Sequence, residues 1–332
     1  MIPSLSELRP HLLNPDLSEA DCLKAIRSLS SGFTSSRDKM GNYGDNPDLV
    51  SAYTQLYLPT NWPKLEFVLS QLSDEIKQNL SDAHFIDFGC GPGTYSLAWC
   101  DSIKAKSVTL VDRAHGMLDQ ANKLMEHFYP NVPASVYRMT PPRPEGKVVL
   151  FFGHSINEIG VDGALDVIRR LDPDYVFFIE PGTSDFFKQA IKLRTALIEQ
   201  GMSIAYPCPS LAKCPNDWCH QVWRGSHDLE VERLCQKAQI DRRSQAMTAH
   251  LYSKEEFKDD RSTLTRFLTE TKFSFDWEIC DGSETLHKVQ LQKKQFSKSE
   301  AKEMQKQNVG IRFRYEVEKV LGDGILRAKL LK

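Results

Sequence analysis

Three glycines that follow an acidic residue in the first third of the chain could bind a nucleoside-containing ligand. They occur in the run Asp87-Phe88-Gly89-Cys90-Gly91-Pro92-Gly93, at the end of an apolar segment that begins at His84. Glycines at such a point permit a sharp turn and let the backbone approach a ligand closely. Nineteen residues after Gly93, Asp112 ends a second apolar segment, where a carboxylate can accept hydrogen bonds from both hydroxyls of a ribose. The spacing therefore predicts a ligand site where these two segments end.

A cysteine-rich segment between residues 207 and 220 could bind a metal. Its pattern is C-x5-C-x4-C-H, with prolines beside the first two cysteines. Three thiolates and the histidine could close a zinc tetrahedron, whereas three thiolates and a distant fourth, Cys235 or Cys280, would suit a cubane iron–sulfur cluster. A catalytic nucleophile and simple core packing are the alternatives to a metal. The candidate ligands within the segment are Cys208, Cys214, Cys219 and His220.

The glycine run needs a strand before it and a helix after it, and the surrounding pattern predicts both. Apolar residues recur every three or four positions through residues 1–80, which indicates helices, with a loop rich in Ser, Gly and Asn at 30–48. From residue 84, short apolar strands alternate with helical periodicity, which favours parallel strands joined by right-handed crossovers. The expected fold class is therefore α/β, a Rossmann-like, doubly wound sheet. The expected strands are 84–89, 107–111, 135–138, 148–152 and 175–179, and the expected helices are 117–127, 163–171 and 186–199.

Past residue 200 the alternation of strands and helices stops. We expect the sheet to end with an antiparallel pair, 248–254 with 273–280, so that the cysteine-rich segment is an insertion between the fifth and sixth strands. Strand-like alternation at 285–295 and 310–331 surrounds a basic helical run at 297–307. The expected domains are a helical N-terminal region (1–80), an α/β core (81–200), a cysteine-rich insertion with the last sheet strands (201–283) and a small, basic, β-rich C-terminal extension (284–332).

The composition is that of a globular chain, with 332 residues of which 41% are hydrophobic and 26% charged. These values exclude collagen-like, coiled-coil and wholly disordered proteins. The longest apolar runs have five residues, far below the ~18 that span a bilayer, so we expect no membrane segment. The first 25 residues contain several acidic side chains and lack the apolar stretch of a signal peptide. We therefore expect a cytoplasmic, reducing location, in which the eight cysteines are thiols or ligands rather than disulfides.

Positive charge is concentrated in the last part of the chain. Residues 281–332 contain twelve Lys or Arg and seven Asp or Glu, although the whole chain has 42 basic and 44 acidic residues. This asymmetry favours contact with a polyanion. The candidate phosphate contacts are Lys293, Lys294, Lys298, Lys302 and Lys306.

The glycine run resembles motif I of class I S-adenosylmethionine-dependent methyltransferases. A dinucleotide-binding fingerprint would need glycine at Thr94, whereas the spacing acidic-x-G-x-G-x-G fits as it stands. The resemblance implies that S-adenosylmethionine is bound. After the fourth strand the chain lacks the Pro-Pro-aromatic motif of nucleobase-amine methylases, and His154 and Glu158 are the candidate bases there. The implied cofactor-binding residues are Asp87, on the methionine ammonium group, Gly89, Cys90, Gly91, Gly93, Asp112, Arg113 and Met117, near the adenine.

Two further motifs resemble a more specific family. Glu180-Pro181-Gly182-Thr183 and Asp217-Trp218-Cys219-His220, with the proline-flanked cysteines, look like the methyltransferase-like family of the small ribosomal subunit, which occurs in bacteria and as a mitochondrial ribosome assembly factor. Residues 52–60 and Cys280-Asp281-Gly282 extend the resemblance over about 45–310.

That resemblance implies association with small-subunit ribosomal RNA, in ribosome assembly or translation, with S-adenosylmethionine bound and methyl transfer in question. It also implies a 4Fe-4S cluster. The alternatives are an active S-adenosylmethionine-dependent RNA methyltransferase and a zinc-stabilised protein methyltransferase; the oligomeric state is not indicated. The implied cluster ligands are Cys208, Cys214, Cys219 and Cys280.

Overall fold

The computed structural model describes every residue except 36–42, 216 and 332. The chain forms two compact units, residues 1–176 with 225–244, and residues 177–224 with 245–332. None of the described helices combines the length and the apolar character that crossing a membrane requires.

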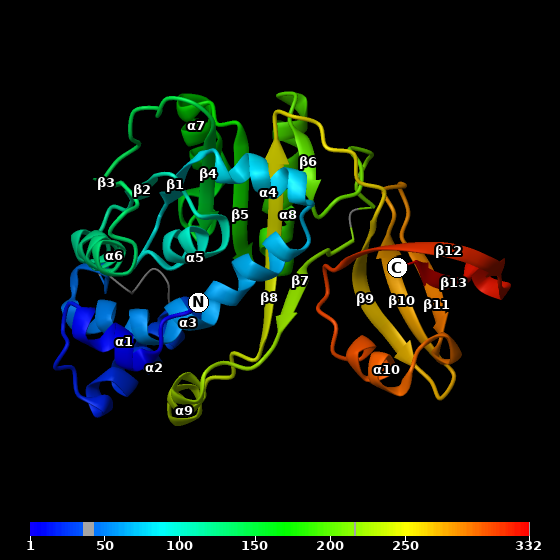
Figure 1. Ribbon diagram of the computed structural model, residues 1–332, viewed down its shortest axis with the longest axis horizontal. Helices are drawn as coiled ribbons and strands as arrows, with labels where there is room; N and C mark the ends of the chain where they lie inside the picture. The colour runs from blue at the N-terminus through cyan, green and yellow to red at the C-terminus, as the bar shows by residue number, and fades with distance from the viewer. Residues whose placement is uncertain (36–42, 216, 332) are drawn as a thin grey trace. The chain divides into compact units, whose positions relative to one another are not determined.

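The first unit consists of a helical N-terminal region and parallel strands joined by helices (Figure 1). Its helices are α1 (Leu5–Leu8), α2 (Glu19–Ser35), α3 (Pro47–Ser70), α4 (Asp74–Ser81), α5 (Thr94–Ile103), α6 (His115–Phe128), α7 (Ile156–Leu171) and α9 (Leu229–Ala238), with 3-10 turns η1 (Arg9–His11) and η3 (Tyr43–Asp45). Its strands are β1 (His84–Phe88), β2 (Val108–Val111), β3 (Ala134–Tyr137) and β4 (Val148–Gly153).

These strands lie in the order β3-β2-β1-β4, and each pairs in parallel with its neighbours. The residues of β2 and all but the last of β4 are buried, as expected for parallel strands that are covered on both faces. Continuous apolar runs with helical periodicity between them therefore predict the α/β fold class correctly. Each predicted strand and helix of this core is found, with ends that differ by one or two residues, except that the helix predicted at 163–171 begins at Ile156.

The N-terminal region is helical, as predicted, but its loop is shorter than expected. Helix α2 continues to Ser35 and α3 begins at Pro47, so helices occupy both ends of the predicted loop 30–48, whose residues 36–42 lie outside the described residues. The start of α3 is set by Asn46, whose side chain accepts hydrogen bonds from two backbone N–H groups of the first turn. Proline at the first helical position needs no hydrogen-bond partner there.

The second unit contains the remaining strands of the α/β core and a closed barrel (Figure 1). Its core elements are β5 (Tyr175–Pro181), which begins in the first unit, α8 (Ser184–Glu199), β6 (Ser203–Tyr206), β7 (Gln221–Arg224) and β8 (Ser244–Ser253). Its later elements are β9 (Ser262–Glu270), β10 (Ser274–Cys280), β11 (His287–Gln292), η4 (Lys293–Gln295), α10 (Lys298–Met304), β12 (Arg312–Val320), η5 (Gly322–Gly324) and β13 (Leu326–Leu331).

The end of the core differs from the expectation in two ways. Strand β6, which is too short to show alternation, comes before the cysteine-rich segment, so that segment lies between β6 and β7 and not between the fifth and sixth strands. Strand β8 pairs with β5, β7 and β6, the last in antiparallel register, and the predicted pairing of 248–254 with 273–280 is wrong. Residues 274–280 instead form β10 of the barrel, because pairing partners depend on contacts that local patterning does not encode.

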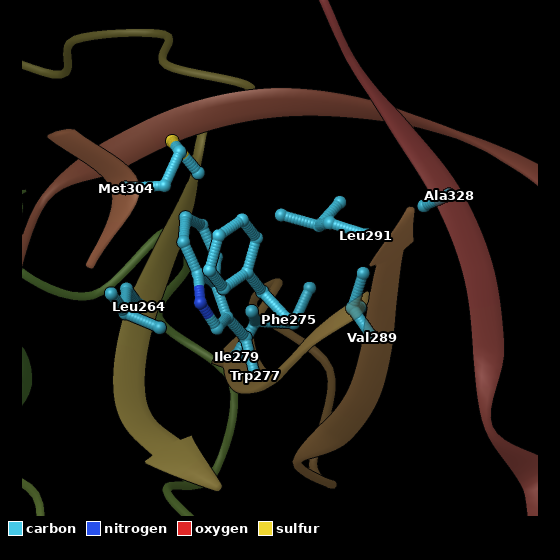
Figure 2. Packing of buried hydrophobic residues seen from close by; sticks show 8 residues of the cluster. All are labelled: Leu264, Phe275, Trp277, Ile279, Val289, Leu291, Met304 and Ala328. Carbon is cyan, nitrogen blue, oxygen red and sulfur yellow. The ribbon is translucent and has the colours of Figure 1, made fainter. Parts of the chain in front are cut away.

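The barrel closes through the strand order β10-β11-β13-β12-β9. Its strands come from both sides of the domain boundary expected at residue 283. The interior is filled by alternate residues of each strand, and Figure 2 shows the Trp277 indole packed among aliphatic side chains and Phe275. Phe267 and Phe313 meet the Trp277 ring edge-on. The buried cluster consists of Leu264, Phe275, Trp277, Ile279, Val289, Leu291, Met304 and Ala328.

Candidate cofactor and metal sites

The glycine loop joins β1 to α5 with a backbone that L-residues rarely adopt. Gly89, Gly91 and Gly93 all have positive φ, and Gly93 is the N-cap of α5. A Cβ on Gly89 would lie 2.5 Å from the Cβ of Ser155, whereas a Cβ on Gly91 would meet no atom of the described chain within 4 Å. The loop is therefore tightly packed at Gly89 and open at Gly91, beside the N-terminus of a helix.

Asp87 lies at the bottom of this loop, fully buried. The Ser96 hydroxyl donates to its Oδ2 at 2.7 Å, while its Oδ1 has no hydrogen-bond partner among the described residues. Burial raises the pKa of Asp87 to about 7; the Ser96 hydrogen bond opposes this rise and the charge of Asp112 adds to it. A buried carboxyl with a free oxygen can receive an ammonium group, which would favour its charged form.

Asp112 joins the end of β2 to the glycine loop. Its carboxylate accepts hydrogen bonds from the backbone N–H of Gly91 and of Ala114, each at 2.9 Å. Burial is the largest influence on this group and raises its pKa, and the two backbone hydrogen bonds oppose that rise. Two carboxylate oxygens offer about four acceptor positions, so Asp112 can still accept from ribose hydroxyls.

The other residues predicted to bind the cofactor occupy different surroundings. Cys90 is buried and its Sγ donates to the Gly91 carbonyl, and burial raises the pKa of this thiol well above its usual range. Arg113 is exposed and pairs with Glu158 at 3.7 Å. Met117 packs in a small apolar cluster with Val50 and Ala114.

A buried polar cluster after β4 contains two residues that sequence reasoning missed. His154, which follows β4, has a φ of +60°, and its Nε2 lies 3.3 Å from both the Nζ of Lys64 and the hydroxyl of Tyr95. Lys64 is only 3% exposed although it is a lysine of α3. A lysine between Trp62-Pro63 and Leu65 has apolar neighbours in the sequence, which is a signal that could have identified it. Glu158, the second candidate base, lies in the first turn of α7.

Four of the cysteines line one pocket in the second unit. Three come from the segment between β6 and β7, and the fourth, Cys280, is the last residue of β10. Arg194, Trp218 and Arg266 also line the pocket. None of the eight cysteines forms a disulfide. The cysteines of the pocket are Cys208, Cys214, Cys219 and Cys280.

The thiols of this pocket influence one another electrostatically. Burial raises the pKa of Cys208 to about 11; Arg194 lowers it, and Cys280 and Cys214 raise it further. The pKa of Cys219 is raised by burial and then by the other three cysteines. Burial thus disfavours the thiolate forms of Cys208 and Cys219, and a bound cation would supply the charge that stabilises them.

Arg194 and Ser210 hold the cysteine-rich segment in place. The Arg194 Nη2 donates to the carbonyls of Ser210 and Ala212 at 3.3 and 2.7 Å, and its buried Nε has no hydrogen-bond partner in the described part of the chain. The Ser210 hydroxyl donates to the Gly282 carbonyl at 2.5 Å. This bond connects the segment to the turn that follows Cys280.

The other two candidate ligands do not line this pocket. His220 stacks on Trp218, with ring centroids 4.6 Å apart. Cys235 is buried on α9 in the first unit. Within the described ranges, no three His, Cys, Asp or Glu side chains are arranged so that they could hold a metal ion.

The chain was compared with known families and structures. The family described as "Mitochondrial small ribosomal subunit Rsm22" matches residues 47–314, which is most of the chain. The chain belongs to the Rsm22 family. Its match includes the glycine loop, the cysteine-rich segment and Cys280. No curated protein matches this Rsm22-family chain.

Solved structures that resemble the Rsm22-family chain are methyltransferases of low sequence identity. An RNA methyltransferase candidate from Pyrococcus horikoshii is 12% identical and covers 71% of this chain and 100% of its own, with a TM-score of 0.39. Magnesium protoporphyrin IX methyltransferase from Synechocystis, with bound S-adenosylhomocysteine, is 11% identical. It covers 69% of this chain and 100% of its own, with a TM-score of 0.39. A methyltransferase from Aquifex aeolicus is 14% identical and covers 46% of this chain and 92% of its own, with a TM-score of 0.34. Because these scores are low, the fold assignment relies on the strand order and the glycine loop.

The five predicted phosphate contacts lie close together in sequence, on α10 and on the residues just before and after it. Lys293 and Lys294 belong to η4, Lys298 and Lys302 to α10, and Lys306 follows α10. Lys293 forms an ion pair with Glu270 and its Nζ lies 4.8 Å from the Phe275 ring centroid. The other four are in no ion pair within the described residues.

Proposed function

We propose that this Rsm22-family chain is a methyltransferase-like protein that binds small-subunit ribosomal RNA and assists ribosome assembly or translation. The observation that supports it most is the family match over residues 47–314, because the family is described by its association with the small ribosomal subunit. The basic C-terminal part supplies a surface for RNA phosphates, with Lys293, Lys294, Lys298, Lys302 and Lys306 as contacts. The cytoplasm is the compartment in which we place it.

We further propose that the glycine loop binds S-adenosylmethionine. The unpartnered Oδ1 of Asp87 suits the methionine ammonium group, the space beside Gly91 admits the ligand, and Asp112 can accept from the ribose. The remaining contacts are Gly89, Cys90, Gly93, Arg113 and Met117. When bound, the cofactor supplies an electrophilic methyl group. In our proposal it serves mainly as a structural ligand, because the Nε2 of His154, the candidate base after β4, is already in contact with Lys64 of α3 and Tyr95 of α5.

The pocket of four cysteines is, in this proposal, the site of a 4Fe-4S cluster. Four thiols line one pocket and match the number of ligands that such a cluster takes, although in the described residues their side chains are not arranged around a common metal position. Arg194 places positive charge beside Cys208, which would offset the negative charge of a cluster with four thiolates. Such a cluster would connect the segment between β6 and β7 to the end of β10. Its role is then to stabilise this part of the fold rather than to transfer electrons. The ligands are Cys208, Cys214, Cys219 and Cys280.

The functional proposal is tested by sedimentation with small ribosomal subunits and by methyl transfer. The purified chain should sediment with small subunits or their precursors, and should incorporate little labelled methyl into their RNA. Asp87→Ala should lose S-adenosylmethionine binding. Robust methyl incorporation that disappears in Asp87→Ala would instead establish the alternative, an active RNA methyltransferase.

The cluster proposal is tested by the colour and the iron content of anaerobically purified protein. Wild type should be brown, with a broad absorption band near 400 nm and about four iron atoms per chain. Cys280→Ser should lose most of both, because one of the four ligands is removed. Cys235→Ser is the matched control, since Cys235 is buried on another unit. A colourless protein with one zinc and no labile sulfide would contradict the cluster and favour a zinc site.

A further inference from the structure

The connectivity of the barrel is that of an oligonucleotide-binding (OB) fold. Strands β9, β10 and β11 form an antiparallel meander, β13 is parallel to β11, and β12 closes the barrel by pairing antiparallel with both β13 and β9. Helix α10 lies between β11 and β12 along the chain. A five-stranded barrel of this Greek-key order binds oligonucleotides or oligosaccharides on its second and third strands and on two loops, one between its first two strands and one between its last two. Here these are β10, β11, residues 271–273 and residues 321–325.

The loop at 271–273 presents an aromatic ring to solvent. Phe273 is 74% exposed, more than any other aromatic side chain of the described residues. The backbone of this loop is fixed, because the Thr271 hydroxyl accepts hydrogen bonds from the N–H groups of Phe273 and Ser274, and the Phe273 carbonyl accepts from the Lys293 N–H at 2.8 Å. An exposed aromatic ring on a fixed backbone is suited to stacking on a planar partner.

Three lysines lie on or next to the loop that carries this ring. The Nζ of Lys272 lies 5.7 Å from the Phe273 ring centroid, and Lys293 and Lys294 follow the adjacent end of β11. Lys293 forms an ion pair with Glu270, whereas Lys272 and Lys294 are in no ion pair within the described residues. An exposed aromatic ring with a lysine beside it and two more lysines on the adjoining segment fits a polyanion with a flat apolar group, which is the chemistry of a nucleotide.

We propose that the surface formed by Lys272, Phe273, Lys293 and Lys294 binds an unpaired nucleotide of single-stranded RNA. Phe273 stacks on the base, and the lysines contact the flanking phosphates. A base within a duplex is covered on both faces by its neighbours, so this surface selects single-stranded over double-stranded RNA. The inference rests on the proposed RNA-binding function and specifies which form of RNA the barrel takes.

The test compares variants of the full-length, anaerobically purified chain in binding a fluorescein-labelled oligouridylate. Phe273→Ala should weaken binding about tenfold, because one stacked base is lost, and Phe273→Trp should retain it. Val317→Ala is the matched control, since Val317 is an apolar residue within β12 of the same barrel that is 45% exposed. Lys272→Gln and Lys294→Gln should each lower the salt dependence of binding, by about 0.7 in the slope of log K against log salt.

Two results would overturn the inference while leaving general RNA binding intact. One is a Phe273→Ala variant that binds oligouridylate as tightly as wild type while the lysine variants bind more weakly. The other is equal affinity of the wild type for a duplex of the same length. A wild-type chain that binds neither RNA would overturn the proposed RNA-binding function as well.

Discussion

Asp87 is the residue at which a bound ligand would change the charge most directly, because its carboxyl group is buried. It lies in the glycine loop with one oxygen hydrogen-bonded to Ser96 and the other without a partner in the described residues. Its pKa is about 7 instead of the ordinary 3.8 because burial disfavours the carboxylate. Near neutral pH, the ligand-free protein therefore holds this group partly protonated.

The first prediction concerns the pH dependence of stability and Asp87. Between about pH 4 and pH 7 the folded state holds a proton on Asp87 that the unfolded state has released, so the free energy of unfolding should fall as pH rises through this window. The expected loss is roughly 4 kcal/mol, from ~1.4 kcal/mol per pKa unit. Asp87→Asn, which is neutral at every pH, should lack this loss. Urea denaturation of the ligand-free chain at several pH values measures it.

Ser96→Ala provides the control for this prediction. It removes the hydrogen bond that lowers the pKa of Asp87 and should therefore extend the fall in stability to higher pH and enlarge the total loss, with the same slope per pH unit. If wild type and Asp87→Asn showed parallel stability curves between pH 4 and pH 7, the carboxyl would already be ionised in the fold, and the explanation from burial would be wrong.

At the scale of elements, the turn from β1 to α5 contains one glycine that is packed against the protein and another that borders open space. Gly89 is closed in by Ser155, while Gly91 has open space beside it. Both have positive φ, so an alanine at either position costs about 1 kcal/mol of backbone strain. The two glycines therefore have the same conformational requirement and different surroundings.

The second prediction uses this pair. Gly89→Ala should lower the free energy of unfolding by about 2–4 kcal/mol, because its Cβ would overlap Ser155 in addition to the strain. Gly91→Ala should cost only about 1 kcal/mol but should weaken S-adenosylmethionine binding at least tenfold, because its methyl group occupies ligand space. Urea denaturation and calorimetric titration measure the two effects. Gly91→Ala with wild-type affinity would place the cofactor elsewhere.

The barrel is the element that sequence periodicity describes least well. Alternation predicts β11, β12 and β13, and the capping box at Ser297 and Glu300 marks the start of α10. The barrel also needs β9 and β10, which lie before residue 283, in the expected cysteine-rich domain and not in the expected C-terminal extension. Closure depends on the pairing of β12 with β9, through Arg312 and Thr263, which are far apart in sequence. Pairing at that separation leaves no local signal.

For the whole molecule, a cluster in the cysteine pocket would couple metal binding to folding. Its ligands come from the segment between β6 and β7 and from β10, so a cluster would cross-link residues that are otherwise held by Arg194, Ser210 and packing. Metal binding that requires the folded arrangement adds its free energy to stability. The effect should be confined to the second unit, which contains all four ligands.

The third prediction follows from this coupling. Anaerobic removal of iron by a chelator should lower the midpoint of thermal unfolding by roughly 5–10 °C. Hydrogen exchange should increase at the amides of β10 and of residues 208–219, and should stay unchanged in β1 and β2. Cys235→Ser with its cluster intact should behave as wild type. Unchanged exchange at β10 after chelation would show that Cys280 is not a ligand.

The sequence by itself determined the α/β core, the glycine loop and the division of charge between the C-terminal part and the rest. These features are local: continuous apolar runs, helical periodicity and glycine spacing each depend on a few neighbouring residues. The same holds for the candidate cysteines, because three of the four lie within one short segment. Periodicity was least informative where a strand is as short as β6.

Only the tertiary structure shows that Cys280 lines one pocket with Cys208, Cys214 and Cys219, because Cys280 is a single cysteine far along the chain with no local pattern. It also brings Lys64 of α3 and Tyr95 of α5 into contact with His154, which follows β4. Finally, it assembled β9 to β13 into one barrel and placed Phe273 beside Lys293. Each of these contacts joins residues far apart in the chain, and their free energy exists only once the intervening segments have folded.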